Sequence, residues 1–577
     1  MMEHSVQRPS ASDTLVITLE QGLFALIFAA ALFLRLWNLN TIPLQSAESV
    51  TALQSWSMYR GLPAAIQQSP LLVYLNFLVF LTIGASDASA RALPAVAGSV
   101  LVLLPYFGRR YVGSVTAIIA ALLLAFSPTL TFFSRYVGEG TLVAALSLGL
   151  VFCALSYARK RNWTLPYYAS ALILGLLLAS GLMGYLNASI FVLFVFGVVG
   201  LKKTAWGKRQ DILSAFPDFS RLWPVGPEAR NWFLLFSAAI VVAVTGGLTN
   251  LHGLQEGTAG LLFSAVPSGS KGTTPAYYAQ LAMTYETIVV VFAFVDVFYS
   301  PRRKSLFDWF LIWWAAASLL FISVLPEKSA VLIVQPLVPM VFLAAELAEH
   351  LLRWLLRERS WISLGALALV CLPPLFLLLF VLSRFTLPGE TVPKEFAAAP
   401  VFVLLLAFVG SAYWRGIRYA SNLWGMLWFA LLFALMLHTT ANLNFRPVQN
   451  PAEPLVTSVT EADVRNLVAD VDRVLAGAGR EESNETIVVD RAYRAPLGWY
   501  LRNYDVRYVS TAAQNALLVV ASSDANLPSN NYAMQRYTIG ASAPLKTTDF
   551  GAFWRWLVYR ETRGTVKYRD VVLYVKI

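Results

Sequence analysis

Two glutamates in the polar segments between long apolar runs could act as an acid or a base in catalysis. Glu48 opens an amphipathic stretch, residues 46–60, where a carboxylate suits the positive end of a helix dipole. Glu139 ends the polar stretch 134–139 that follows another apolar run. A carboxylate at either position could take a proton from a hydroxyl group. Two simpler interpretations stay open: Glu48 could be a solvated loop residue, and Glu139 could pair with Arg135.

Three cations in the same kind of segment could bind a phosphate group. Arg35 lies near the end of the first apolar run, Arg135 lies within 134–139, and Lys328 lies in a short turn, 326–328. A guanidinium or ammonium group at a site of low dielectric binds phosphate oxygens strongly. Alternatively, Arg35 extends its charge to the membrane surface and Lys328 contacts lipid phosphates in general. The sequence contains no nucleotide-binding loop, paired metal-binding histidines or serine-nucleophile motif, and we predict no metal ligands.

The composition is that of a membrane protein. Hydrophobic residues make up 57 % of the 577 residues and charged residues 13 %, against about a quarter in soluble domains. Apolar runs long enough to cross a bilayer recur from Leu23 to about Leu437. The formal net charge of +11 comes largely from short basic clusters between these runs, which are typical of cytoplasmic loops. We therefore predict no nucleic-acid partner.

The basic clusters also predict the topology. Six of them are assigned to the cytoplasm: 109–110, 159–161, 202–230, 302–304, 353–359 and 415–418. The spans between clusters must then come in pairs, which gives thirteen spans, a cytoplasmic N-terminus and a C-terminal domain outside. The expected spans are 17–37, 91–108, 112–132, 140–158, 165–182, 184–201, 231–250, 277–299, 306–325, 329–350, 361–385, 399–414 and 421–441.

Residues 70–86 are apolar too, but their 17 residues stand at the lower limit for a span. A crossing there would move the cluster at 109–110 to the outside. We therefore predict an interfacial or re-entrant helix on the outer side. The outer side then receives 38–90, 133–139, 251–276, 326–328, 386–398 and everything after about 442.

The predicted fold class is an all-α polytopic membrane domain of about thirteen helices with a C-terminal extracytoplasmic α/β domain. Residues 1–16 form a cytoplasmic tail, 17–445 the membrane domain with its first outer loop at 38–90, and 446–577 the outer domain. Within the outer domain, 459–479 has the periodicity of an amphipathic helix. Short runs rich in valine, isoleucine and tyrosine around it predict strands.

Several stretches resemble the GT-C superfamily of integral-membrane glycosyltransferases. They are LFLRLWNL at 32–39, SPLLVYLNFLVFLTIGASDASARALPAVAG at 69–98, LAFSPTLTFFSRYVGEGTL at 124–142, LPEKSAVLIVQPLVPMVFLAA at 325–345, APLGWYLRNYDVRYV at 495–509 and WRWLVYRE at 554–561. Within the superfamily the chain is similar to the protein mannosyltransferase and aminoarabinose-transferase-like group (family 39-like). There it looks most like the branch of flippase-activity-associated glycosylation proteins. The resemblance covers the whole chain and implies thirteen or so spans with a cleft on the outer side.

The resemblance also implies roles. The donor is a sugar linked to polyprenyl phosphate. An acidic residue of the first outer loop, here Glu48, acts as the base or orients the acceptor, and Glu139 is the second acidic candidate. Arg35, Arg135 and Lys328 are the implied contacts of the donor phosphate. No cofactor is named, and a divalent metal is left undecided. The expected partners are the lipid-linked donor, membrane lipids and a lipid, glycan or protein acceptor at the outer face of the plasma membrane.

Three departures from the family pattern leave the activity open. Ala47 takes the place of the first acid of an acidic pair, Gly140 replaces an acidic residue, and Gly181-Leu182 replaces a Lys-Glu pair. One interpretation is a membrane glycosyltransferase, and the alternative is a catalytically degenerate GT-C protein that serves as an accessory or assembly subunit. A transporter is disfavoured, because transporters show charges near the midplane or broken helices in two matching halves, whereas the charges here gather at one face.

Overall fold

The computed structural model describes most of the chain. The described residues are 18–62, 69–159, 164–204, 226–248, 276–299, 305–325, 328–384, 395–445, 451, 453–456, 459–477, 487–510, 516–522, 531–542 and 566–577. The N-terminal tail 1–16, the stretch 554–561, nearly all of the outer segment 251–276 and most of 386–398 lie outside this part.

Helices occupy the positions of all thirteen expected spans within the described ranges. Ten are long and apolar enough to cross a membrane: α1 (Leu19–Leu36), α4 (Asp87–Val112), α7 (Gly140–Arg159), α9 (Leu182–Lys203), α12 (Pro227–Val244), α17 (Leu306–Val324), η4 (Ala330–Ile333) with α18 (Val334–Glu358), α19 (Trp361–Arg384), α20 (Glu395–Arg415) and α21 (Ile417–Phe445). Two bent helix pairs raise this number to twelve, and the thirteenth position holds α8 (Thr164–Ala179), a shorter helix of 16 residues. The chain is therefore a multi-pass integral membrane protein, and the predicted fold class is confirmed.

The bent pairs meet at their breaks. Helix α5 (Ser114–Phe126) turns by 60° into α6 (Pro128–Ser134), because the residue before a proline avoids helical geometry. Helix α15 (Tyr277–Tyr285) turns by 108° into α16 (Thr287–Tyr299), with Glu286 between them. The buried Glu286 carboxylate accepts hydrogen bonds from the Ser127 hydroxyl at 2.5 Å and the Thr129 N–H at 2.9 Å. This contact fixes the start of α6, whose other end leads into Arg135.

Two short helices lie within residues 38–90, the segment predicted to be the first outer loop. Helix α2 (Ser46–Tyr59) packs against α3 (Pro70–Ile83), which begins at the cap Ser69 with Pro70 in its first position. Helix α3 ends at Gly84, whose φ of 78° suits a glycine. With 14 residues, α3 is shorter than a usual span. Its predicted location at the outer membrane surface stays a prediction.

The C-terminal domain is a six-stranded mixed sheet with one long helix. The strands follow the order β1 (Val459–Thr460), β5 (Tyr532–Ser542), β6 (Lys567–Lys576), β4 (Leu518–Ala521), β2 (Ile487–Asp490) and β3 (Val506–Val509). Strand β2 runs parallel to β3 and β4, and the other pairs are antiparallel. Helix α22 (Asp463–Gly477), expected from the periodicity at 459–479, buries Val464, Leu467, Val471 and Leu475 against this sheet.

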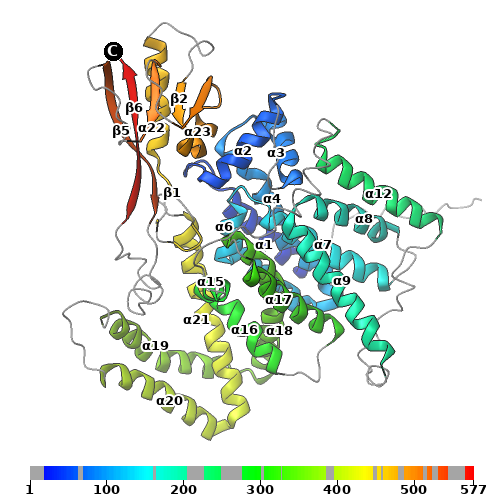
Figure 1. The fold of residues 1–577 in the computed structure, drawn as a ribbon. Coiled ribbons are helices and arrows are strands. Elements are labelled where there is room, and N and C mark those ends of the chain that lie inside the picture. Colours follow the sequence, from blue (N-terminus) through cyan, green and yellow to red (C-terminus); the bar gives the residue numbers. More distant parts are fainter. Residues whose placement is uncertain are drawn as a thin grey trace, which may run out of the picture.

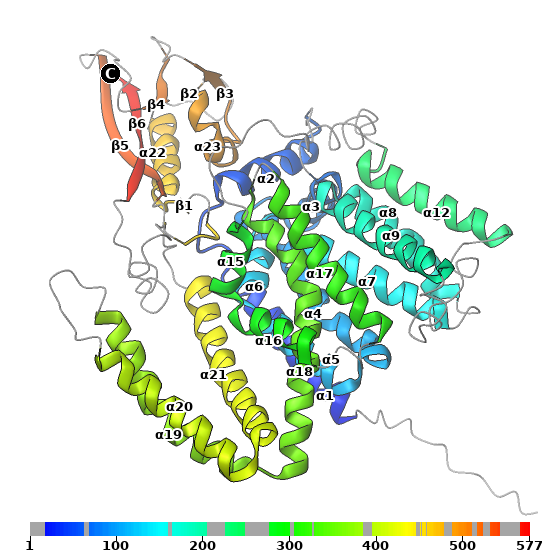
Figure 2. The ribbon, with the colours of Figure 1, turned by 60° about the horizontal axis from the view of Figure 1, so that its bottom comes forward.

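A short helical turn joins the two domains. After η5 (Arg491–Tyr493), helix α23 (Arg494–Tyr500) buries Leu497 in the core of the sheet domain and also packs on α2 (Figure 1). Trp499, 1 % exposed, lies in an apolar cluster with Leu44, Ala52 and Phe80 from the segment 38–90 and with Val137 from the turn after α6. Figure 2 shows the same arrangement from another direction, with the sheet beside α2 and apart from α19 and α20.

Candidate functional site

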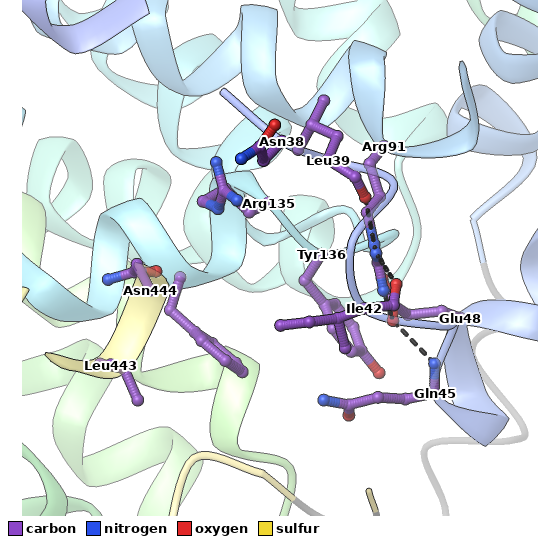
Figure 3. Close-up of a pocket in the computed structure, with 11 residues that line it drawn as sticks. Asn38, Leu39, Ile42, Gln45, Glu48, Arg91, Arg135, Tyr136, Leu443 and Asn444 are labelled. Carbon is purple, nitrogen blue, oxygen red and sulfur yellow. Dashed lines mark hydrogen bonds and ion pairs between the residues drawn. The ribbon is translucent and has the colours of Figure 1, made fainter. Parts of the chain in front are cut away.

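A pocket opens where the first outer loop, the end of α6 and the end of α21 meet (Figure 3). It encloses about 410 Å³ of empty space, open solvent at its mouth included. The lining residues are Asn38, Leu39, Ile42, Gln45, Glu48, Arg91, Phe132, Arg135, Tyr136, Leu443 and Asn444. Two of the five residues predicted from the sequence, Glu48 and Arg135, thus line one pocket.

Glu48 is held in a buried ion pair. Its carboxylate receives the Nε of Arg91 at 2.8 Å on Oε1 and the Nη2 at 2.6 Å on Oε2. The backbone N–H groups of Val137 and Gln45 donate to the same two oxygens, at 2.9 Å and 2.8 Å. A carboxylate has about four lone-pair sites. All four are occupied here, so Glu48 binds three segments together and has no free site for an acceptor proton.

Arg91 extends this clamp to the backbone of the first outer loop. Its Nη1 donates to the carbonyl oxygens of Leu39 and Ile42, at 3.0 Å and 2.7 Å, and its Nη2 to that of Pro43 at 3.1 Å. The planar guanidinium can serve these acceptors and a carboxylate at once, which a lysine ammonium could not. Hydrogen bonds from one arginine of α4 therefore hold the pocket wall formed by residues 38–45 in place.

Arg135 has no carboxylate partner among the described residues. Its Nη1 donates to the carbonyl oxygens of Leu34, Arg35 and Trp37, at 2.9, 3.2 and 2.6 Å, and so caps the C-terminal end of α1. Its guanidinium lies 5.1 Å from the ring centre of Phe445. The Nε and Nη2 groups donate to no described residue. One edge of the guanidinium is thus left for a ligand, and Figure 3 shows it beside Asn38.

Burial, and then the charge of Arg91, lower the pKa of Arg135 to about 10. The group therefore stays charged at neutral pH. A half-buried cation without a counter-charge in a membrane protein is costly unless an anion satisfies it. The pocket is chemically suited to an anionic ligand.

Tyr136 and Glu139 follow Arg135 in the same turn. The Tyr136 side chain lines the pocket, and its hydroxyl makes no hydrogen bond to a described residue. Burial first, and then the charges of Glu48 and Glu139, raise the pKa of Tyr136, so its phenol stays a neutral donor. Glu139 does not line the pocket, and its carboxylate accepts a hydrogen bond from its own backbone N–H. Burial raises the pKa of Glu139.

The remaining two predicted cations lie outside the pocket lining. Arg35 is fully buried and donates to the Ser134 hydroxyl at 3.2 Å and to carbonyl oxygens of Ala31, Leu124 and Ala125, so it joins α1 to α5 and α6. The Lys328 ammonium donates to three carbonyl oxygens at the end of α17, those of Ile322, Ser323 and Leu325. Their assignment as contacts of the donor phosphate stays a prediction. Both groups already donate hydrogen bonds to protein oxygens.

The lining residues that were not predicted from the sequence include Arg91, Tyr136, Asn38 and Asn444. Only Tyr136 had a signal, since it lies between two residues that had been selected. Arg91 is 43 positions from Glu48 in the sequence, and this spacing does not predict their pairing. Among the described residues, no group of three His, Cys, Asp or Glu side chains could hold a metal ion.

Comparison with solved structures shows which known fold the chain shares. No protein-family model matches the sequence, and no curated protein does. Among solved structures, the chain is similar to apo ArnT from Cupriavidus metallidurans, with 17 % identity, a TM-score of 0.59 and 96 % and 98 % of the two chains covered. It is also similar to ArnT of the same organism bound to undecaprenyl phosphate, with 16 % identity, a TM-score of 0.52 and the same coverage. ArnT is an aminoarabinose transferase of the GT-C superfamily, and the chain therefore has the GT-C fold.

Proposed function

We propose that the protein is a membrane glycosyltransferase that takes a sugar from a polyprenyl-phosphate donor and transfers it to an acceptor at the outer face. The unoccupied edge of the Arg135 guanidinium, facing a pocket whose one described carboxylate is already neutralised by Arg91, carries this proposal. The fold shared with ArnT bound to undecaprenyl phosphate supports the same kind of donor.

The donor phosphate is held by Arg135, with the Asn38 amide and the Tyr136 hydroxyl as neutral donors beside it. In the reaction an acceptor oxygen attacks the anomeric carbon, and the bond from that carbon to the phosphate oxygen breaks. The electron pair leaves with the polyprenyl phosphate, whose added negative charge Arg135 stabilises. The acceptor proton goes to a carboxylate.

We assign the base role to Glu139 and a positioning role to Glu48. The Glu139 carboxylate forms no ion pair with a described residue, and burial raises its pKa, which favours the uptake of a proton by a general base. Glu48 would have to give up a hydrogen bond before it could accept a proton. In this assignment Glu48 lies on the pocket wall, and Glu139 lies beside the pocket in the turn that carries Arg135 and Tyr136.

A second candidate function is favoured by the same saturation of Glu48. A pocket that binds a lipid phosphate without a free carboxylate on its wall also suits an accessory or assembly subunit that has lost catalysis. The two functions differ in turnover and agree on the ligand.

The proposed placement follows the charge pattern. Residues 1–16 lie in the cytoplasm, the membrane domain 17–445 spans the plasma membrane, and 446–577 lie outside. The pocket would then open near the outer leaflet, next to the docked C-terminal domain.

Turnover in native membranes tests the enzyme against the accessory subunit, because such membranes supply the unknown acceptor. Membranes containing the wild type should consume added undecaprenyl-phosphate hexoses or pentoses and release undecaprenyl phosphate. Glu139→Gln should slow this release by about 100-fold or more, the usual effect of losing a general base. Release no faster than in membranes lacking the protein would favour the accessory function.

A further inference from the structure

Several side chains of the C-terminal domain contact one carboxylate of the membrane domain, that of Asp87. Asp87 begins α4 and is 7 % exposed. Its Oδ1 accepts a hydrogen bond from the Trp499 indole N–H at 2.7 Å, and its Oδ2 accepts one from the Tyr500 hydroxyl at 3.1 Å. Arg465 adds an ion pair at 2.9 Å. Three side chains of the C-terminal domain therefore converge on one residue of the membrane domain.

The same side chains also hold the backbone of the pocket wall. The Tyr500 hydroxyl accepts the N–H of Leu44 at 2.7 Å, and the Leu44 side chain is fully buried. Arg465 donates to the carbonyl oxygen of Asn40 at 2.7 Å. Both contacts fall within residues 38–45, which supply Asn38, Leu39, Ile42 and Gln45 to the pocket.

This wall segment is thus held from two sides. Arg91 of the membrane domain donates hydrogen bonds to carbonyl oxygens of this segment. From the C-terminal domain, Tyr500 accepts one of its N–H groups and Arg465 donates to one of its carbonyl oxygens. Asp87 and Arg91 lie four positions apart on α4, on the same face one turn from each other. Both sets of contacts therefore involve the N-terminal end of α4.

We propose that docking of the C-terminal domain sets the shape of the donor pocket, with Tyr500 and Asp87 as positioning residues that act through the segment 38–45. The identity of the ligand, a polyprenyl phosphate, rests on the proposed function. The effect of docking on the shape of the pocket does not depend on the proposed function, because it concerns contacts between the two domains.

These contacts explain why loss of the Tyr500 hydroxyl would change the shape of the pocket. Without the Tyr500 oxygen, the buried N–H of Leu44 would have no acceptor, and such groups are rarely left unsatisfied. The segment would shift to reach another acceptor or water, and Gln45 next to it would move with it. Gln45 donates its N–H to Glu48, so the shift would also reach the buried ion pair.

Tyr500→Phe removes this one oxygen and keeps the ring. Tyr493→Phe is the matched control, since the Tyr493 hydroxyl donates to the carbonyl oxygen of Asp570 inside the C-terminal domain at 3.1 Å. Purified full-length variants would be titrated with undecaprenyl phosphate. We expect the affinity to fall by about fivefold or more in Tyr500→Phe, the size of a usual coupling between sites, and to stay within about twofold in Tyr493→Phe.

Asp87→Asn provides a second variant, which keeps the shape of the side chain and removes its charge. Its affinity should fall in the same direction as that of Tyr500→Phe. Equal affinities for Tyr500→Phe, Asp87→Asn and the wild type would overturn the inference, whatever happens to their melting temperatures. That outcome would leave the proposed function standing.

Hydrogen exchange without ligand separates the two proposals. If the wild type does not bind undecaprenyl phosphate, the proposed function fails, and the amide exchange of Leu44 and Gln45 still tests the docking claim. Both amides should exchange faster in Tyr500→Phe than in the wild type and in Tyr493→Phe. Unchanged exchange at Leu44 and Gln45 would then overturn the inference.

Discussion

Arg91 and Glu48, 43 positions apart in the chain, form a buried two-pronged ion pair with contacts of 2.8 Å and 2.6 Å. The pair joins α4 to the start of α2, and its carboxylate also receives a backbone N–H from the turn after α6. Both residues of the pair line the pocket together with Arg135. The residue that the sequence marks as a base is thus a structural centre of the site.

Glu48→Gln should destabilise the protein. The change leaves the Arg91 charge buried without a counter-charge, which costs about 3–5 kcal/mol in buried pairs. Glu20→Gln is the control, because Glu20 pairs with Arg109 at 3.2 Å in a partly exposed position and should cost at most about 1 kcal/mol. Unfolding of both variants in the same detergent measures the difference. Equal effects would show that the pair contributes little to stability.

Glu139→Gln should change how stability depends on pH. Because burial raises the pKa of Glu139, the folded protein binds a proton there more tightly than the unfolded chain. The stabilisation from this group is complete below about pH 4, the ordinary range of glutamate, and is lost as the pH rises through the raised pKa. Melting temperatures of wild type and variant should therefore diverge in favour of Glu139→Gln with rising pH. Parallel curves would contradict the raised pKa.

The sequence predicted the helices well and the pairing of side chains poorly. Apolar runs and basic clusters depend on local composition, and the structure has a helix or a bent helix pair at each predicted span. The turn at Pro128 had a visible cause, whereas the 108° bend at Glu286 had none. The contacts of Arg91 with Glu48 and of Asp87 with Tyr500 join distant segments, and a single sequence carries no signal for them.

Lys328→Gln should leave the affinity for undecaprenyl phosphate unchanged within about twofold and lower stability by about 1 kcal/mol. The reason is that the ammonium caps the carbonyl oxygens at the end of α17 and does not line the pocket. Titration of the purified variant and its melting temperature provide both values. A large loss of affinity would restore Lys328 to the role in phosphate binding predicted from the sequence.

Cysteine labelling tests the topology. In a background without Cys153 and Cys371, Ala205→Cys should react only with reagents that reach the cytoplasm, and Ala265→Cys only with reagents outside. The basic cluster 202–230 and the polar segment 251–276 motivate these two positions. Reaction of both from one side would exclude thirteen spans in the proposed order.

The affinity of the purified protein for undecaprenyl phosphate, compared between wild type and Arg135→Gln, tests the central claim most directly. A lost charged hydrogen bond to phosphate should weaken binding by about 10-fold or more in the variant. Arg109→Gln removes a cation that pairs with Glu20 away from the pocket and should bind like the wild type. Saturable binding by the wild type that falls in Arg135→Gln alone is the predicted result. Equal binding by all three proteins, or none by the wild type, would contradict a donor-phosphate site at Arg135.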